Sequence, residues 1–202
     1  MKEIVFFDFD YTLAKTVENV MVWSPRGIHT HNGKSYILLN PKQYNVYKLA
    51  NDEFIDEESY RQFKKVNLKL AKPIESTIFL LKSFLKENYV VKILSARPQE
   101  VQGYVMKFLE INNIAHNNQI EFKGCKSSSP ILKLNFVLEC AEKYSPTKIT
   151  LFDDSQKVID CLEENFNIKQ IELLLCLVDV TGGREVLHFK KLLNNRRLNE
   201  RS

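Results

Sequence analysis

Cysteine is scarce in this chain, with four residues among 202. None belongs to a CxxC pair, and none has a histidine near it at the spacing of a zinc site. We therefore expect buried free thiols at Cys125, Cys140, Cys161 and Cys176. The histidines also lack metal-ligand spacing, so we assign no role to His29, His31, His116 and His188.

Long hydrophobic runs are missing as well. No apolar stretch reaches the roughly 20 residues that a membrane-spanning helix needs, and residues 171–180 are apolar but too few. We expect no signal peptide, because Lys2 and Glu3 lead directly into a short run typical of a strand. We expect a soluble, cytoplasmic protein without a membrane partner.

Neither sign of charge dominates the composition. The formal net charge is +4, with 27% charged and 44% hydrophobic residues, which is ordinary for a soluble globular protein. The mild positive excess permits an anionic substrate but does not by itself indicate nucleic-acid binding. The length of 202 residues fits one domain, or one domain with a small insertion.

The residues from Val5 to Leu13 join an apolar, strand-like start to a polar end. Asp8, Asp10 and Thr12 are spaced two apart, so they would share a direction in an extended chain. We expect the chain to turn near Asp8, which places all three at the C-terminal end of the strand, where open parallel sheets bind ligands. Buried carboxylates are costly unless they are paired or hold a cation. The pattern therefore indicates a charged site.

Apolar runs and helical patterns alternate along the rest of the chain. The runs predict strands over residues 1–8, 89–94, 120–122, 148–152 and 171–178. Amphipathic spacing predicts helices over residues 72–88, from Pro98 to about residue 109, and over 131–144 and 156–165. The tail from Glu185 onward is predicted to be helical and then frayed. Such alternation favours right-handed crossovers and a parallel sheet, and so an α/β protein.

Residues 14–71 are too many for an ordinary loop between the first strand and its crossover helix. Residues 27–30 and 35–39 could pair as a hairpin around Asn32-Gly33, and Pro41 suits the first turn of a short helix through Leu49. We interpret the segment as a small cap over the site; a decorative surface subdomain is the alternative. The expected organisation is a core of residues 1–13 and 72–180, a cap of 14–71 and a basic C-terminal tail of 181–202.

Three of the predicted strands end in polar residues that can do chemistry. The first ends in Asp8, Asp10 and Thr12, the second in Ser95 with Arg97 two residues later, and the fourth in Asp153-Asp154. Parallel strands bring their C-terminal ends to one edge of the sheet, so these side chains are predicted to meet. This coincidence is stronger evidence for a site than any one of the motifs.

The order of these residues resembles the haloacid dehalogenase superfamily, whose members are mostly Mg²⁺-dependent phosphatases. Asp-Phe-Asp-Tyr-Thr at residues 8–12 is similar to its DxDxT motif, Ser95 to its second motif, and Asp153-Asp154 to its fourth. Lys133 is the best candidate for the third-motif lysine, with Lys123 and Lys126 as alternatives. The resemblance covers residues 2–177 except the cap, and Tyr11 departs from it, since many members have glycine there.

The resemblance implies a Rossmann-like, three-layer α/β/α fold with a central parallel sheet of strand order 5-4-1-2-3 and a cap inserted after strand 1. It implies that Asp8 is the nucleophile that forms an aspartyl-phosphate and that Asp10 is the general acid and base. Lys133 would offset negative charge, and Ser95, Thr12 and Arg97 would contact the substrate. The implied Mg²⁺ ligands are Asp8, Asp10 through its backbone carbonyl, Asp153 and, directly or through water, Asp154.

Each residue also has a plain structural interpretation. Asp8 and Asp10 could form a turn, and Ser95 could cap a helix. Asp153-Asp154 could cap the following helix, and Lys133 could be a solvated lysine. Arg97 could equally make a surface ion pair.

The sequence thus predicts a Mg²⁺-dependent phosphohydrolase that acts on a phosphorylated small molecule or a nucleic-acid end. Its basic tail suggests a nucleotide or polynucleotide 3′-phosphate. A non-catalytic scaffold and a phosphotransferase to an acceptor other than water are the alternatives, and the oligomeric state is left open.

Overall fold

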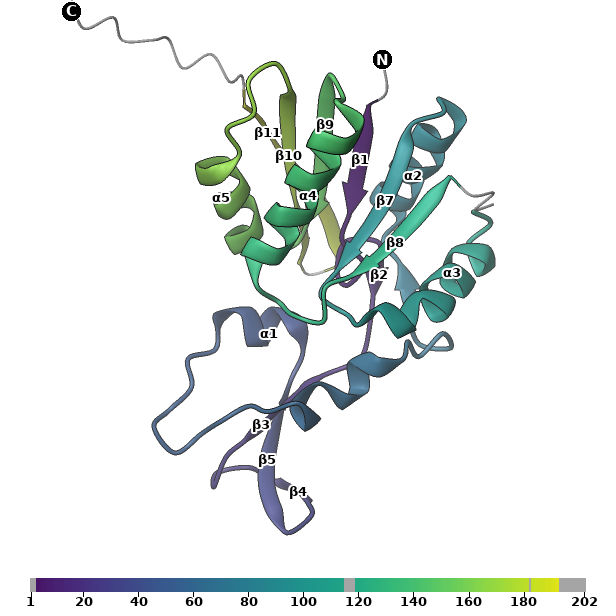
Figure 1. Cartoon of the computed structure of the whole chain (residues 1–202). Coiled ribbons are helices and arrows are strands. Elements are labelled where there is room, and N and C mark those ends of the chain that lie inside the picture. The colour runs from purple at the N-terminus through teal and green to yellow at the C-terminus, as the bar shows by residue number, and fades with distance from the viewer. Residues whose placement is uncertain (1–2, 115–118, 182, 193–202) are drawn as a thin grey trace, which may run out of the picture.

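The computed structural model describes residues 3–114, 119–181 and 183–192 (Figure 1). Strand β1 (Ile4–Phe7) lies inside a six-stranded sheet of order β11-β10-β9-β1-β7-β8. Its neighbours on one side are β7 (Val90–Ser95) and β8 (Ile120–Gly124), and on the other β9 (Lys148–Asp153) and β10 (Glu172–Thr181). These five strands run parallel. The predicted α/β class is confirmed.

Helices cover both faces of the sheet because β1 is apolar on both sides. Val5 and Phe7 pack in a core cluster with α2 (Glu75–Lys86) and α3 (Gln102–Ile111). Ile4 and Phe6 pack in a second cluster with α4 (Pro130–Tyr144) and α5 (Gln156–Asn165). The alternation follows from the two-residue period of a strand. A short 3₁₀ helix, η2 (Gln99–Val101), leads into α3.

The C-terminal segment differs from the prediction. The residues after Glu185 were expected to be helical, but Arg184–Leu192 forms strand β11, which pairs antiparallel with β10, so the sheet is mixed. Gly183 has a φ of 80°, which lets the chain reverse at once into a hairpin. Lys190 and Lys191 then suit an edge strand, where charge opposes further pairing. Residues 193–202, with Arg196, Arg197 and Arg201 of the predicted tail, lie outside the described residues.

The inserted segment leaves and rejoins the core through a two-stranded ribbon. Strand β2 (Ala14–Lys15) pairs antiparallel with β6 (Lys72–Pro73). Residues 72–73 were predicted to start the helix, but α2 begins only at Glu75. The carboxylate of Glu185 accepts hydrogen bonds from the backbone N–H groups of Glu75 and Ser76, which otherwise lack partners at a helix start.

The segment between the two ribbon strands, hereafter the cap, has its own small sheet of order β3-β5-β4. Its strands are β3 (Val20–Trp23), β4 (His29–His31) and β5 (Lys34–Leu39). The predicted hairpin is confirmed, with Asn32 and Gly33 at φ of 49° and 75° in its turn. Helix α1 (Pro41–Val46) begins at Pro41 as predicted but ends before Leu49. A 3₁₀ helix, η1 (Glu58–Lys64), follows it in the chain. Strand β3 was not predicted.

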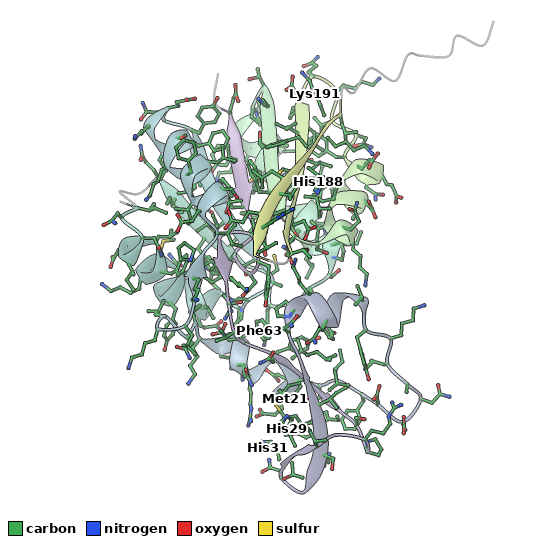
Figure 2. The ribbon with its side chains drawn as sticks, turned by 180° about the vertical axis from the view of Figure 1, so that it is seen from behind. Met21, His29, His31, Phe63, His188 and Lys191 are labelled. Carbon is green, nitrogen blue, oxygen red and sulfur yellow. The ribbon has the colours of Figure 1, made fainter. Side chains whose placement is uncertain are left out.

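Figures 1 and 2 place the cap beyond one end of the core sheet. In Figure 2, Phe63 lies where cap and core meet, whereas Met21, His29 and His31 lie farther out in the cap. Trp23 packs inside the cap against Tyr36 and Phe54, with ring centroids 5.9 Å and 6.1 Å away. The four cysteines are free thiols, two buried and two half-buried. Among the described residues, no helix has the length and apolar character needed to cross a membrane.

Candidate active site

The C-terminal ends of β1 and β9 bring two acids together. Asp8 follows β1 directly, and its N–H donates to the carbonyl of Phe152 at 2.9 Å, which extends the pairing with β9 by one step. Asp153 is the last residue of β9, and Asp154 follows it. Asp8 and Asp153 are buried, at 6% and 1% exposure. The ends of β1 and β9 therefore lie together, as predicted.

Lys133 connects the two acids from the first turns of α4. Its Nζ donates to Asp8 Oδ1 at 2.8 Å and to Asp153 Oδ2 at 2.7 Å. The two alternative lysines lie elsewhere: Lys123 Nζ is 5.3 Å from the centroid of a phenylalanine ring, and Lys126 pairs with Glu57 of the cap at 3.5 Å. Of the three candidates, Lys133 is the one whose ammonium group contacts the acids.

The acids hold more negative charge than Lys133 can balance. Burial raises the pKa of Asp8 to about 7; Lys133 opposes this shift, while Asp153 and Asp10 add to it. Burial also raises the pKa of Asp154 well above its usual range, and Asp153 and Asp8 raise it further. For Lys133, burial alone would lower the pKa, but the carboxylates of Asp153 and Asp8 outweigh it and raise the pKa.

Three acids are arranged so that one cation could bind them all. Asp8, Asp153 and Asp154 each offer one carboxylate oxygen, and these three oxygens lie within 4.8 Å of one another. Carboxylate oxygens are the ligands that hard divalent cations such as Mg²⁺ prefer, and the surplus negative charge would be neutralised by such an ion. The donor set thus fits the implied cofactor. The side chain of Asp10 is not in this group.

Cation affinity should depend on pH because the cation must replace a proton. With the pKa of Asp8 raised to about 7, Asp8 is largely protonated below that pH and must lose its proton on binding. We expect Mg²⁺ affinity, measured by calorimetry, to rise between pH 6 and pH 8 and to level off above. An affinity that is constant over this range would show that Asp8 is already ionised and would contradict the electrostatic description.

The carboxylate of Asp10 is held by two partners, Arg97 and Thr16. Arg97 Nε donates to its Oδ2 at 2.8 Å and Arg97 Nη2 to its Oδ1 at 2.7 Å. The Thr16 hydroxyl also donates to Oδ1, at 2.6 Å. Both oxygens of the predicted general acid are therefore engaged in this conformation, although Asp10 still lines the cavity described below.

The structure gives Arg97 neither of the roles considered from the sequence, substrate contact or surface ion pair. Its side chain is 0% exposed and also bonds Glu18 Oε2 at 3.0 Å. Its Nη1 donates to the carbonyls of two cap residues, Phe63 at 3.3 Å and Lys65 at 2.7 Å. A guanidinium group has five N–H donors, and these five bonds use all of them. Arg97 therefore ties Asp10 to the cap and has no donor left for a substrate.

Ser95 and Thr12 are both fully buried, in contrast to the predicted substrate contacts. Ser95 accepts a hydrogen bond from the Arg97 N–H at 3.2 Å, and its neighbour Ala96 lines the cavity. Thr12 is 0% exposed, and its hydroxyl oxygen has no hydrogen-bond partner among the described residues. Its carbonyl accepts from the Thr77 hydroxyl, so Thr12 anchors the turn to α2.

The backbone conformation of Tyr11 explains why glycine suits this position of the turn. Its φ is 56°, in the left-handed region that side chains other than glycine disfavour. The N–H of Tyr11 donates to the Ala14 carbonyl at 2.7 Å, which closes the turn. Its ring lies 5.9 Å from Nζ of Lys42 in the cap. Backbone strain is thus stored beside the acids, as is common at functional sites.

A cavity of about 250 Å³ lies between the core and the cap. Its core side includes the acids, Lys133 and the loop of Ser127 and Ser128. Its cap side is formed by α1, η1 and Val20 of β3. Two further contacts join the cap to the core: Lys42 Nζ with Asp179 Oδ1 at 3.2 Å, and the exposed pair of Lys126 with Glu57.

Comparison with protein-family models, with curated proteins and with solved structures gave no match for this chain.

Thr16 and Glu18 are partners in the site that could not be predicted from the sequence. Glu18, at 4% exposure, stands among polar residues in the sequence, and a buried acid can be recognised only once its basic partner is known.

Proposed function

We propose that this protein is a Mg²⁺-dependent phosphomonoester hydrolase of the haloacid dehalogenase type. The observation that carries the proposal is the buried Lys133 bridging Asp8 and Asp153, with Asp154 close enough to share a cation with them. A structural ion pair needs only one acid for each lysine. Three acids around one lysine in a cavity fit a site for a cation and a phosphate.

The arrangement of strands supports the same proposal. When β1, β7, β8, β9 and β10 are numbered in chain order, their positions in the sheet read 5-4-1-2-3, with β11 added outside β10. This agrees with the order implied by the resemblance. The cap emerges directly after β1 and lies over the acids, so it can enclose a substrate.

In the proposed reaction, Asp8 attacks phosphorus, the bond to the leaving oxygen breaks, and an aspartyl-phosphate forms. A bound Mg²⁺ would be held by Asp8, Asp153 and Asp154 and would neutralise charge on the phosphoryl oxygens. Lys133 fixes Asp8 and adds a positive charge in a site with little water. Water then cleaves the acyl-phosphate and releases inorganic phosphate.

Asp10 is the candidate to protonate the leaving oxygen and later to deprotonate the water. Both of its oxygens accept hydrogen bonds from Arg97 or Thr16 in this conformation. These three bonds occupy three of the four lone pairs of the carboxylate, so one lone pair on Oδ2 remains for the proton to be transferred. Asp10 also lines the cavity in which a leaving group would lie.

The basic tail gives limited support to a nucleic-acid substrate. Two of its lysines, Lys190 and Lys191, pair with Glu163 at 2.5 Å and Glu172 at 2.8 Å. Figure 2 shows Lys191 at the end of the sheet that lies away from the cap. A phosphorylated small molecule is therefore the better-supported substrate.

The test is hydrolysis of an aryl phosphate by the purified protein, with Mg²⁺ and with a chelator. We expect turnover that requires Mg²⁺ and stops when the chelator is added. A well-folded protein that binds Mg²⁺ but hydrolyses no member of a panel of phosphate esters would contradict the proposal and favour a scaffold.

The lysine assignment can be tested by substitution with methionine, which keeps the length of the side chain. Lys133→Met should lower turnover by about 10²-fold or more, because a preorganised charge next to the reacting group is lost. It should also lower stability in the absence of metal, since two buried carboxylates lose their partner. Lys123→Met is the matched control and should stay within about twofold of wild type, since Lys123 does not line the cavity. Equal losses in both variants would disprove the assignment to Lys133.

A further inference from the structure

The cavity has two chemically different walls. The core wall carries the acids and Lys133, which would act on the phosphate group of any phosphomonoester. The cap wall is mainly apolar and aromatic, with Val20, Pro41, Tyr44, Tyr60 and Phe63, and it also includes the charged residues Glu57 and Lys64. The cap wall therefore faces the part of the substrate that differs from one phosphate ester to another.

Two tyrosines give the cap wall a fixed shape. Tyr44 of α1 and Tyr60 of η1 have ring centroids 6.1 Å apart and planes at 86°. Their hydroxyls are hydrogen-bonded to each other at 2.6 Å. Because the polar atoms of the pair engage one another, the pair offers mostly ring surface to a ligand. Aromatic rings prefer other rings in offset or edge-to-face contact.

The size of the cavity limits what can bind. Pockets for drug-sized ligands usually measure about 300–1,000 Å³. The volume of about 250 Å³ in this protein is below that range, so it suits a small ester.

We propose that the substrate is a small phosphomonoester whose alcohol carries one planar ring, and that Tyr44, Tyr60 and Phe63 select that ring. The inference rests on the proposed hydrolysis at Asp8. A simple aryl ring and a pyrimidine base share this chemistry, and the experiment separates them.

The first experiment compares kcat/KM for benzyl phosphate and glycerol 3-phosphate, since both release an ordinary alcohol. Wild type should prefer benzyl phosphate about tenfold, in line with the energy of a ring–ring contact. Tyr60→Leu should lose most of this preference, and Tyr60→Phe, which keeps the ring, should retain it. Tyr104→Leu, on the exposed face of α3, is the control and should behave as wild type.

A third substrate, uridine monophosphate, identifies the ring. If it reacts faster than benzyl phosphate, the ring is a pyrimidine base; if slower, the ring is a simple aryl group. Equal kcat/KM for benzyl and glycerol phosphates with Mg²⁺-dependent turnover would overturn the ring selection and leave the proposed hydrolysis standing.

A binding experiment keeps the two proposals separable. Calorimetry would compare benzylphosphonate with propylphosphonate, neither of which can be hydrolysed at the ester position. If no ester is turned over, the proposed hydrolysis fails, but tighter binding of benzylphosphonate that Tyr60→Leu removes still supports a ring-selective site. Equal affinity for the two phosphonates overturns it.

Discussion

Asp8→Asn is expected to abolish phosphate-ester hydrolysis, with a loss of at least about 10³-fold in kcat. The amide cannot form the acyl-phosphate, while its shape is nearly that of the carboxylate. Metal-free stability should not fall, since burial beside other acids raises the pKa of Asp8 to about 7 and ionising it is therefore unfavourable. Steady-state kinetics and chemical denaturation of both proteins provide the measurement.

A suitable control is Asp160→Asn, a similar change on α5, where Asp160 is exposed and contacts only Gln156 among the hydrogen bonds of the described residues. It should leave kcat unchanged. Asp8→Asn with wild-type turnover would mean that the phosphoryl group never resides on Asp8. A large loss of stability in Asp8→Asn would instead mean that Asp8 is mainly the structural partner of Lys133.

Arg97→Met should strongly destabilise the protein. It leaves Asp10 and Glu18 buried without their cation and removes two bonds to cap carbonyls. Breaking a buried ion pair by removing one partner costs about 3–5 kcal/mol. For a protein of this size, that corresponds to a fall in Tm of about 10 °C. Thermal and urea unfolding, followed by the fluorescence of the single tryptophan in the cap, measure it.

Arg61→Met is the matched control for Arg97→Met. Arg61 pairs with Glu58 at 3.3 Å on the cap surface, with both side chains partly exposed. Exposed pairs contribute about 0–1 kcal/mol, so this variant should stay close to wild type. Arg97→Lys should fall between, because an ammonium cannot supply five donors in a plane. If Arg97→Met has the same Tm and free energy of unfolding as Arg61→Met, Arg97 does not hold the cap to the core.

The central strand and its acids could be predicted because their signals are local. An unbroken apolar run that ends in Asp8 and Asp10 identifies a buried strand and a charged end within ten residues. The same holds for β9 and Asp153. Parallel pairing then requires these ends to meet at one edge of the sheet. The helix carrying Lys133 was likewise evident from its apolar period, and its lysine was the preferred candidate.

The surroundings of Arg97 could not be predicted, because its partners are distant in sequence. Glu18 lies 79 positions away, and the two cap carbonyls belong to residues whose side chains give no hint of the contact. Arginine is almost never fully buried unless it is paired, so a substrate contact and a surface ion pair were the two roles considered. Here the fold of the cap provides the pairing.

Strand β11 was mistaken for a helix for a different reason. Val186 and Phe189 favour a strand, but Glu185, Lys190 and Lys191 around them are residues that strands disfavour, so the local signals conflict. The segment forms a strand because the tight turn at Gly183 places it next to the free edge of β10. Pairing with an existing edge outweighs local preference, as is usual for strands.

The most direct test of the central claim is to look for the phosphoryl group on Asp8. Protein mixed with a phosphate ester and Mg²⁺ would be quenched in acid during turnover, digested and analysed by mass spectrometry. We predict a phosphorylated peptide that contains Asp8, absent without Mg²⁺ and absent in Asp8→Asn. Turnover at the same rate with no phosphate on that peptide, or with phosphate on another residue, would contradict the proposed mechanism.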